Sequence, residues 1–226
     1  MNDNNYGLAR SSSRRSKGVS RREVLATGAM AGVVGGVASA FSIPLLANRA
    51  DAASDADKKN DAKILNNALY YEHQAIWAYS FAAGKLTNTD VGKAVLAIAL
   101  ANQADHKKHR DLLASAVQSL GGSPVKAESS YDVSSYIKKG EGNIDSDVNI
   151  AKLALALETD AAIAYTTEIA KLRTPALITA GASIGSTESA HATAIRAAFN
   201  ALGVKIPVVP ASFVSAQTRD AWVLKV

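Results

Sequence analysis

A glutamate and a histidine lie three residues apart in the last third of this 226-residue chain, as Glu188 and His191. Residues at this spacing share one face of an α-helix, so the carboxylate and the imidazole would be neighbours. The rest of that face is apolar or small from Leu177 to Leu202. A buried carboxylate and imidazole are costly unless a metal ion or a hydrogen-bond network satisfies them. The pair therefore points to a buried polar site to which other segments must contribute.

Four segments have the apolar periodicity of helices and are bounded by start and stop signals. The expected helices span residues 61–83, 90–120, 148–172 and 175–202. Thr89 and Ser146 are typical caps before the second and third helices, and Pro175 suits the first position of the fourth. No segment shows the alternation of a strand, so the sequence predicts an all-α fold.

The connection between the second and third helices, residues 123–145, is polar and long for a simple loop. We expect Tyr131 and Tyr136 to anchor this crossover. The C-terminal tail is expected to pack onto the helices through Phe213, Trp222 and Val223.

The other three helices also carry polar residues in the middle of their apolar stripes. Glu72 is in the first helix, Glu158 in the third, and His106 and His109 in the second. His109 precedes a Leu-Gly pair by eleven and twelve residues, and His191 does the same. This correspondence predicts that the chain consists of two related helical hairpins joined by the crossover.

The first and third helices also share a Glu, Ala, Ala, Tyr pattern, from Glu72 to Tyr79 and from Glu158 to Tyr165. Helical side chains lean toward the N-terminus, which would bring both tyrosine hydroxyls toward the glutamates. We interpret Tyr79 and Tyr165 as core residues that can also donate hydrogen bonds to the site.

Glutamates on two helices, with Glu-x-x-His on the other two, are the ligand pattern of ferritin-like dimetal bundles. The chain resembles the ferritin-like superfamily over residues 61–203, and bacterial exported ferritin-like domains in particular. The matching positions are Glu72, His109, Glu158, Glu188 and His191. The resemblance implies a four-helix bundle with a long crossover between helices 2 and 3. It also implies one or two iron ions, with manganese or zinc as alternatives, and oxidation of ferrous iron or handling of peroxide.

The second helix departs from that pattern, because His106 stands where Glu-x-x-His requires a glutamate. A neutral imidazole cannot bridge two ions as a carboxylate does, and the site becomes three glutamates and three histidines. A register from Gln103 to His106, as a degraded form of the motif, is an alternative, and Asp105 is interpreted as solvated. The alternative function is a non-catalytic ferritin-like envelope protein that has lost metal binding; iron storage in a cage is a third.

Residues 1–52 are interpreted as a leader that precedes a domain of residues 53–226. Residues 20–25 resemble the twin-arginine export signal, and residues 50–52 suit a cleavage site. The expected location is therefore periplasmic or secreted, with the twin-arginine translocase as a partner during export. An uncleaved membrane anchor over residues 24–48 is the alternative.

The net charge of +5 lies mostly in that leader, which has seven basic and three acidic residues. The remaining 18 basic and 17 acidic residues nearly cancel, so the domain has no electrostatic basis for binding nucleic acid. The chain has no cysteine, which excludes disulfides and iron–sulfur ligation. Metal ions are the expected ligands, and a homodimer is left open.

Deleting Arg21 and Arg22 should abolish export, because the twin-arginine pathway reads this pair. Immunoblots of the cytoplasmic and exported fractions measure the effect. Unchanged export of the deletion variant would contradict the twin-arginine interpretation.

Overall fold

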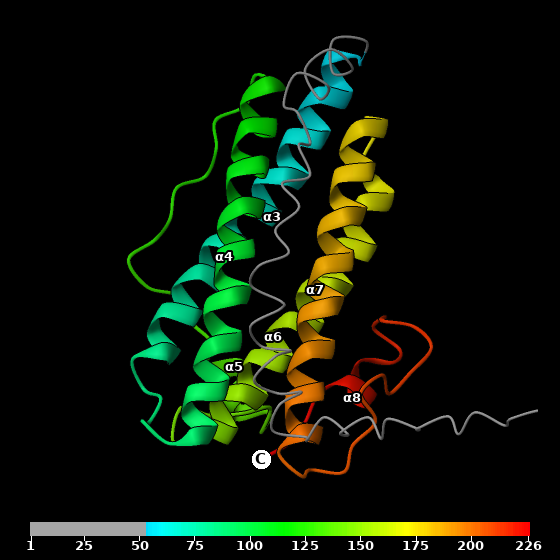
Figure 1. Ribbon diagram of the computed structural model, residues 1–226. Helices are drawn as coiled ribbons and strands as arrows, with labels where there is room; N and C mark the ends of the chain where they lie inside the picture. Colours follow the sequence, from blue (N-terminus) through cyan, green and yellow to red (C-terminus); the bar gives the residue numbers. More distant parts are fainter. Residues whose placement is uncertain (1–52) are drawn as a thin grey trace, which may run out of the picture.

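The computed structural model describes residues 53–226, which form helices and loops without a strand (Figure 1). The expected leader, cleavage site and anchor lie outside the described residues. Within residues 53–226, no helix combines the length and apolarity needed to span a bilayer. The all-α fold class predicted from the sequence is confirmed.

Four long helices run alongside one another and form the bundle (Figure 1). They are α3 (Asp55–Ala83), α4 (Asp90–Ser119), α6 (Asp147–Glu168) and α7 (Pro175–Ala201). The shorter elements are α5 (Ser134–Lys138), the 3₁₀-helix η1 (Ile169–Lys171) and α8 (Arg219–Trp222). Helix α3 packs most extensively on α4, and α6 on α7. The long connection between α4 and α6 is the predicted crossover, and it includes α5.

Side-chain caps explain where three of the helices begin. Thr89 accepts a hydrogen bond from Gly92 N at the start of α4, and Ser146 accepts one from Asn149 N at the start of α6. Helix α3 begins six residues before the expected start, because Ser54 accepts a hydrogen bond from Asp57 N and caps it there.

The start of α7 is fixed from another helix. The fully buried carboxylate of Asp61 in α3 accepts backbone hydrogen bonds from Arg173 and Thr174, both 2.9 Å long. Pro175 then occupies the first turn of α7, as the sequence predicts. The axial position of α7, and with it that of Glu188 and His191, is therefore tied to α3.

The apolar core lies on both sides of the polar residues of the bundle. Along α7, the first cluster ends at Ile184, which packs with residues such as Leu69 and Val117. The second cluster begins at Ala192 and includes Phe199. Glu188 lies between the two clusters, so water is excluded from the site at both ends.

The C-terminal tail packs onto the bundle through α8 rather than through Phe213. Trp222 is buried, but Phe213 is 74% exposed, so the expectation for Phe213 was wrong. The backbone carbonyl of Phe213 accepts the indole N–H of Trp222, so Phe213 holds the tail through its backbone and not through its ring. In the crossover, Tyr131 is buried as expected, and Tyr136 is half-buried.

An ion-pair cluster joins this tail to the crossover. Arg219 donates two hydrogen bonds to Glu141, of 2.7 and 2.6 Å, and also contacts Asp160. The Glu141 side chain is only 2% exposed, and Lys225 donates a further hydrogen bond to it. The hydrogen bonds from Arg219, followed by those from Lys225, hold the pKa of Glu141 down to about 2.

Arg219→Ala should lower the free energy of unfolding by about 2 kcal/mol at pH 7, because it leaves a buried carboxylate short of partners. Arg110→Ala is the matched control. Its partner Asp111 is 69% exposed, so that loss should stay below about 1 kcal/mol.

The difference in the free energy of unfolding between the wild type and Arg219→Ala should also depend on pH. The pKa of Glu141 in the folded protein is below its usual value. The contribution of its ion pairs to the free energy of unfolding is therefore complete above about pH 4.5 and disappears as the pH falls toward 2. Urea denaturation at pH 7 and pH 3 measures both effects. Equal losses for the two arginine variants would refute this role of the cluster.

Candidate metal centre

Six ionisable side chains from all four long helices meet in the interior of the bundle. They are Glu72 from α3, His106 and His109 from α4, Glu158 from α6, and Glu188 and His191 from α7. These are the six residues that the sequence singled out. The most accessible of the six, His109, has a side chain only 11% exposed, so the whole cluster is removed from bulk water.

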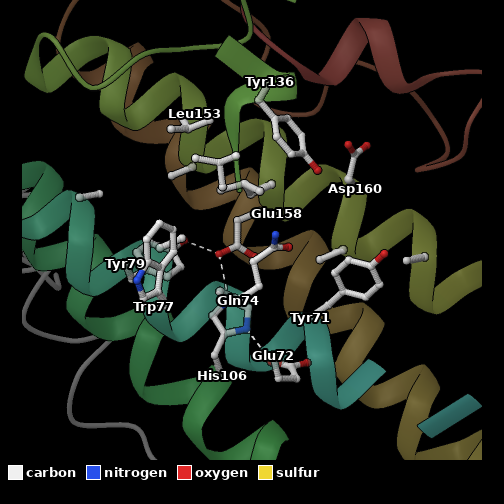
Figure 2. Close-up of a pocket in the computed structure, with 18 of the residues that line it drawn as sticks. Tyr71, Glu72, Gln74, Trp77, Tyr79, His106, Tyr136, Leu153, Glu158 and Asp160 are labelled. Atoms are coloured by element: carbon white, nitrogen blue, oxygen red, sulfur yellow. Dashed lines mark hydrogen bonds and ion pairs between the residues drawn. The ribbon is translucent and has the colours of Figure 1, made fainter. Parts of the chain in front are cut away.

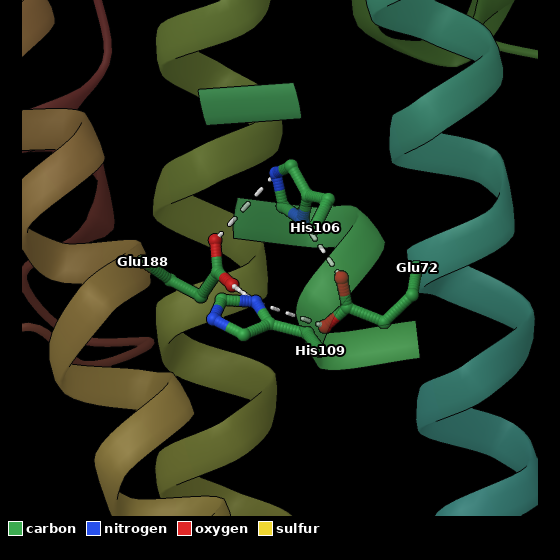
Figure 3. Close-up of side chains that lie close together, drawn as sticks. All are labelled: Glu72, His106, His109 and Glu188. Carbon is green, nitrogen blue, oxygen red and sulfur yellow. Dashed lines mark hydrogen bonds and ion pairs between the residues drawn. The ribbon is translucent and has the colours of Figure 1, made fainter. Parts of the chain in front are cut away.

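A first group of four residues consists of Glu72, His106, His109 and Glu188 (Figure 3). His106 Nδ1 lies 2.7 Å from Glu72 Oε2, and His109 Nδ1 lies 2.9 Å from Glu188 Oε1. His109 Nδ1 also lies 3.7 Å from Glu72 Oε1. One ligand atom from each residue falls within 4.8 Å of all the others, which is close enough to share one cation.

A second group consists of His106, Glu158, Glu188 and His191, with its ligand atoms equally close together. His106 Nε2 lies 3.2 Å from Glu158 Oε1. His191 Nδ1 lies 3.2 Å from Glu158 Oε2 and 3.3 Å from Glu188 Oε2. The two groups share His106 and Glu188, so the site consists of two overlapping halves.

Glu188 is the member of the cluster that protein groups satisfy least. Its side chain is fully buried, yet neither carboxylate oxygen has a hydrogen-bond partner. His109 Nδ1 is also buried without one, although it lies only 2.9 Å from Glu188 Oε1. The ring N–H therefore does not point at the carboxylate. Atoms that approach one another without forming hydrogen bonds suit a shared cation, because a cation would satisfy each of them.

Hydroxyl and amide donors hold two of the other carboxylates. Tyr79 donates to Glu158, and Tyr165 donates to Glu72, each from the opposite helix of the α3–α6 pair. Asn102 of α4 donates to the Tyr79 hydroxyl oxygen over 3.0 Å. The expectation that both tyrosine hydroxyls approach the glutamates agrees with these contacts.

Asp105 has a role that the sequence analysis missed. Its Oδ2 lies 3.5 Å from His191 Nε2, whereas it was expected to be solvated away from the site. The carboxylate can hold the Nε2–H of His191, which leaves Nδ1 facing Glu158 and Glu188. Gln103, which the alternative register would place at the site, donates instead to Ile76 O and Ser80 Oγ, whereas His109 belongs to the first group. No local spacing signals this contact, because His191 lies on another helix.

The carboxylates and imidazoles of the cluster shift each other's pKa values in opposite directions. Burial would raise the pKa of Glu72, but hydrogen bonding and charge from His106 and His109 lower it to about 2. Burial would lower the pKa of His109, but the carboxylates of Glu188 and Glu72 raise it to about 9. Glu158 raises the pKa of His191 to about 12 in the same way.

Glu188 again differs, because burial and the charge of Glu158 raise its pKa. Nearby carboxylates raise the pKa of all three histidines, so a proton and a metal ion would compete for the same ring nitrogens. A metal ion would have to displace protons from these rings to bind them.

The arrangement is asymmetric with respect to two ions. Glu188 has two oxygens, one in each half of the site, and can bridge. His106 faces Glu72 with Nδ1 and Glu158 with Nε2, but a neutral imidazole has a single lone-pair nitrogen. It can therefore bind an ion in only one half at a time.

Comparison with known proteins agrees with the fold. A family model for the ferritin-like domain matches residues 60–201, which is more than half of the chain. No curated protein matches the sequence. A crystal structure of a conserved hypothetical protein from Mycobacterium tuberculosis is similar, with a TM-score of 0.52 and 19% identity over 62% of this chain and 96% of that one. At this identity the likeness shows a shared fold alone. The residues matched by the family model span all four long helices and all six clustered side chains, and the chain belongs to the ferritin-like domain family.

Proposed function

We propose that the cluster holds one or two transition-metal ions, and that the protein is an exported oxidoreductase of the ferroxidase or peroxidase type. The observation that carries the metal site is the fully buried Glu188 carboxylate, which both four-residue groups share and which has no hydrogen-bond partner. The residues that would hold the metal are the three glutamates and three histidines already named.

Mixed imidazole and carboxylate ligands suit iron, manganese and zinc, and the family membership favours iron. When bound, a redox-active ion would supply electron transfer to or from oxygen or peroxide. The protein residues position the ligands. Tyr165 and Tyr79 fix the carboxylates of Glu72 and Glu158, and Asp105 orients the ring of His191.

Export through the twin-arginine pathway is part of the same proposal and is motivated by residues 20–25. That pathway carries folded proteins, so a metal could be loaded before export. The translocase and a homodimer remain predictions.

A second candidate is a non-catalytic bundle in which the same residues serve stability alone. One observation favours it. Several members of the cluster are already paired without a metal, such as His106 Nδ1 with Glu72 Oε2 at 2.7 Å. In that case mutations in the cluster would change the stability equally with and without metal.

Addition of Fe²⁺ under anaerobic conditions should raise the melting temperature of the wild-type protein and not that of Glu188→Gln. Binding at 100 times the dissociation constant contributes about 2.7 kcal/mol, which is readily seen by calorimetry. Elemental analysis of the purified protein measures the metal directly, and Mn²⁺ and Zn²⁺ test the selectivity. A protein that contains no transition metal and takes up none would contradict the proposal.

Without metal, Glu188→Gln should destabilise the protein by about 2 kcal/mol less than Glu158→Gln. Glu158 accepts hydrogen bonds from Tyr79 and faces both His106 and His191, whereas Glu188 accepts none. Urea denaturation in the presence of a chelator compares the two variants. Equal losses would show that Glu188 is satisfied within the protein and has no need of a cation.

A further inference from the structure

A chamber of about 400 Å³ lies beside the metal centre, between α3 and α6 and beneath the crossover. Its lining comes from both helices and from the crossover, including Tyr71 of α3, Leu153 of α6 and Tyr136 of the crossover. Its volume falls within the range of ~300–1,000 Å³ that is typical of small-molecule sites.

The walls of the chamber are mainly apolar. Trp77 and Phe81 of α3 stack with ring centroids 5.1 Å apart, and Leu153 and Leu157 of α6 line the opposite wall. Figure 2 shows Trp77, Tyr71 and Leu153 around the space, with Tyr136 of the crossover at one end. Tyr71 is 51% exposed, so an aromatic side chain at the chamber also reaches solvent.

The chamber reaches the metal centre. Glu72, His106 and Glu158 belong both to its lining and to the two four-residue groups (Figure 2). Tyr79 and Tyr165, which donate to those glutamates, also line it. A molecule in the chamber would therefore have an apolar surround and a few hydrogen-bonding groups at one end.

The charges of the lining favour a neutral ligand. No lysine or arginine is found among the described residues that line the chamber. Its two peripheral carboxylates are already paired, Asp160 with Arg219 and Glu168 with Lys171. An anionic ligand would find no lysine or arginine in the lining and would face the carboxylates of Glu72 and Glu158, and a cationic one would find no free carboxylate at the periphery.

We propose that this chamber binds a neutral small organic molecule with an apolar body, whose polar end lies beside Glu72, Glu158 and the tyrosines. The binding of such a molecule depends only on the chamber. The statement that the bound molecule lies next to a reactive centre rests on the proposed function. Such a molecule would meet the metal site from the α3–α6 side.

Isothermal titration of the full-length protein with 1-octanol and with octanoate tests the proposal. The alcohol should bind with an affinity at least tenfold higher than the carboxylate of the same length. Trp77 lines the chamber, so its fluorescence should change on addition of 1-octanol.

Filling the chamber should remove this binding. Ala161→Phe on α6 and Ala78→Leu on α3 enlarge side chains on opposite walls, and each should weaken 1-octanol binding at least tenfold. Ala104→Phe is the control, because Ala104 is exposed on α4 and does not line the chamber. Melting curves verify that each variant is folded.

The proposal would be overturned if 1-octanol did not bind, or if the Ala161, Ala78 and Ala104 variants bound it equally well. It would also be overturned if octanoate bound as tightly as 1-octanol. The metal proposal is judged separately by elemental analysis. If 1-octanol binds and no metal is found, the chamber proposal stands and the metal proposal fails. If metal is found and 1-octanol does not bind, the metal proposal stands and the chamber proposal fails.

Discussion

The structure depends on burying three carboxylates and three imidazoles at one level of a helical bundle. Isolated charges in such a place would be prohibitively costly, and these groups are tolerable because each glutamate faces at least one histidine. The opposite pKa shifts of Glu72 and His109 express this mutual compensation. The compensation is incomplete at Glu188, whose oxygens have no hydrogen-bond partner, and this is where a cation fits the protein best.

The rest of the fold keeps this layer in place. Asp61 fixes the start of α7 relative to α3, and apolar clusters close the site above and below Glu188. The crossover and the tail lie outside the layer and are held together by Arg219 and Glu141. The chamber between α3 and α6 brings space for a small molecule to one side of the layer, where Glu72, His106 and Glu158 line it.

The six clustered residues could be found from the sequence because helical spacing is local information. A Glu or His within an apolar stripe must face the interior, and four such stripes in a bundle must bring them together. The caps at Thr89 and Ser146 were predictable for the same reason. The ion pair of Asp105 with His191 was not, because it depends on the ring orientation of a residue on another helix. The chamber depends on a spacing between helices that no local pattern encodes, and the exposure of Phe213 depends on the path of the tail over the bundle, which no local pattern encodes either.

The central claim is that Glu188 is shared by a metal site. Anomalous X-ray diffraction from crystals of the protein, collected above and below the iron absorption edge, tests it most directly. The account predicts an anomalous peak beside Glu188, among the carboxylates and imidazoles of Glu72, Glu158, His106, His109 and His191. The wavelength dependence would identify the metal, and a second peak would show a pair. Crystals grown from metal-supplemented protein that show no anomalous density in this layer would contradict the account.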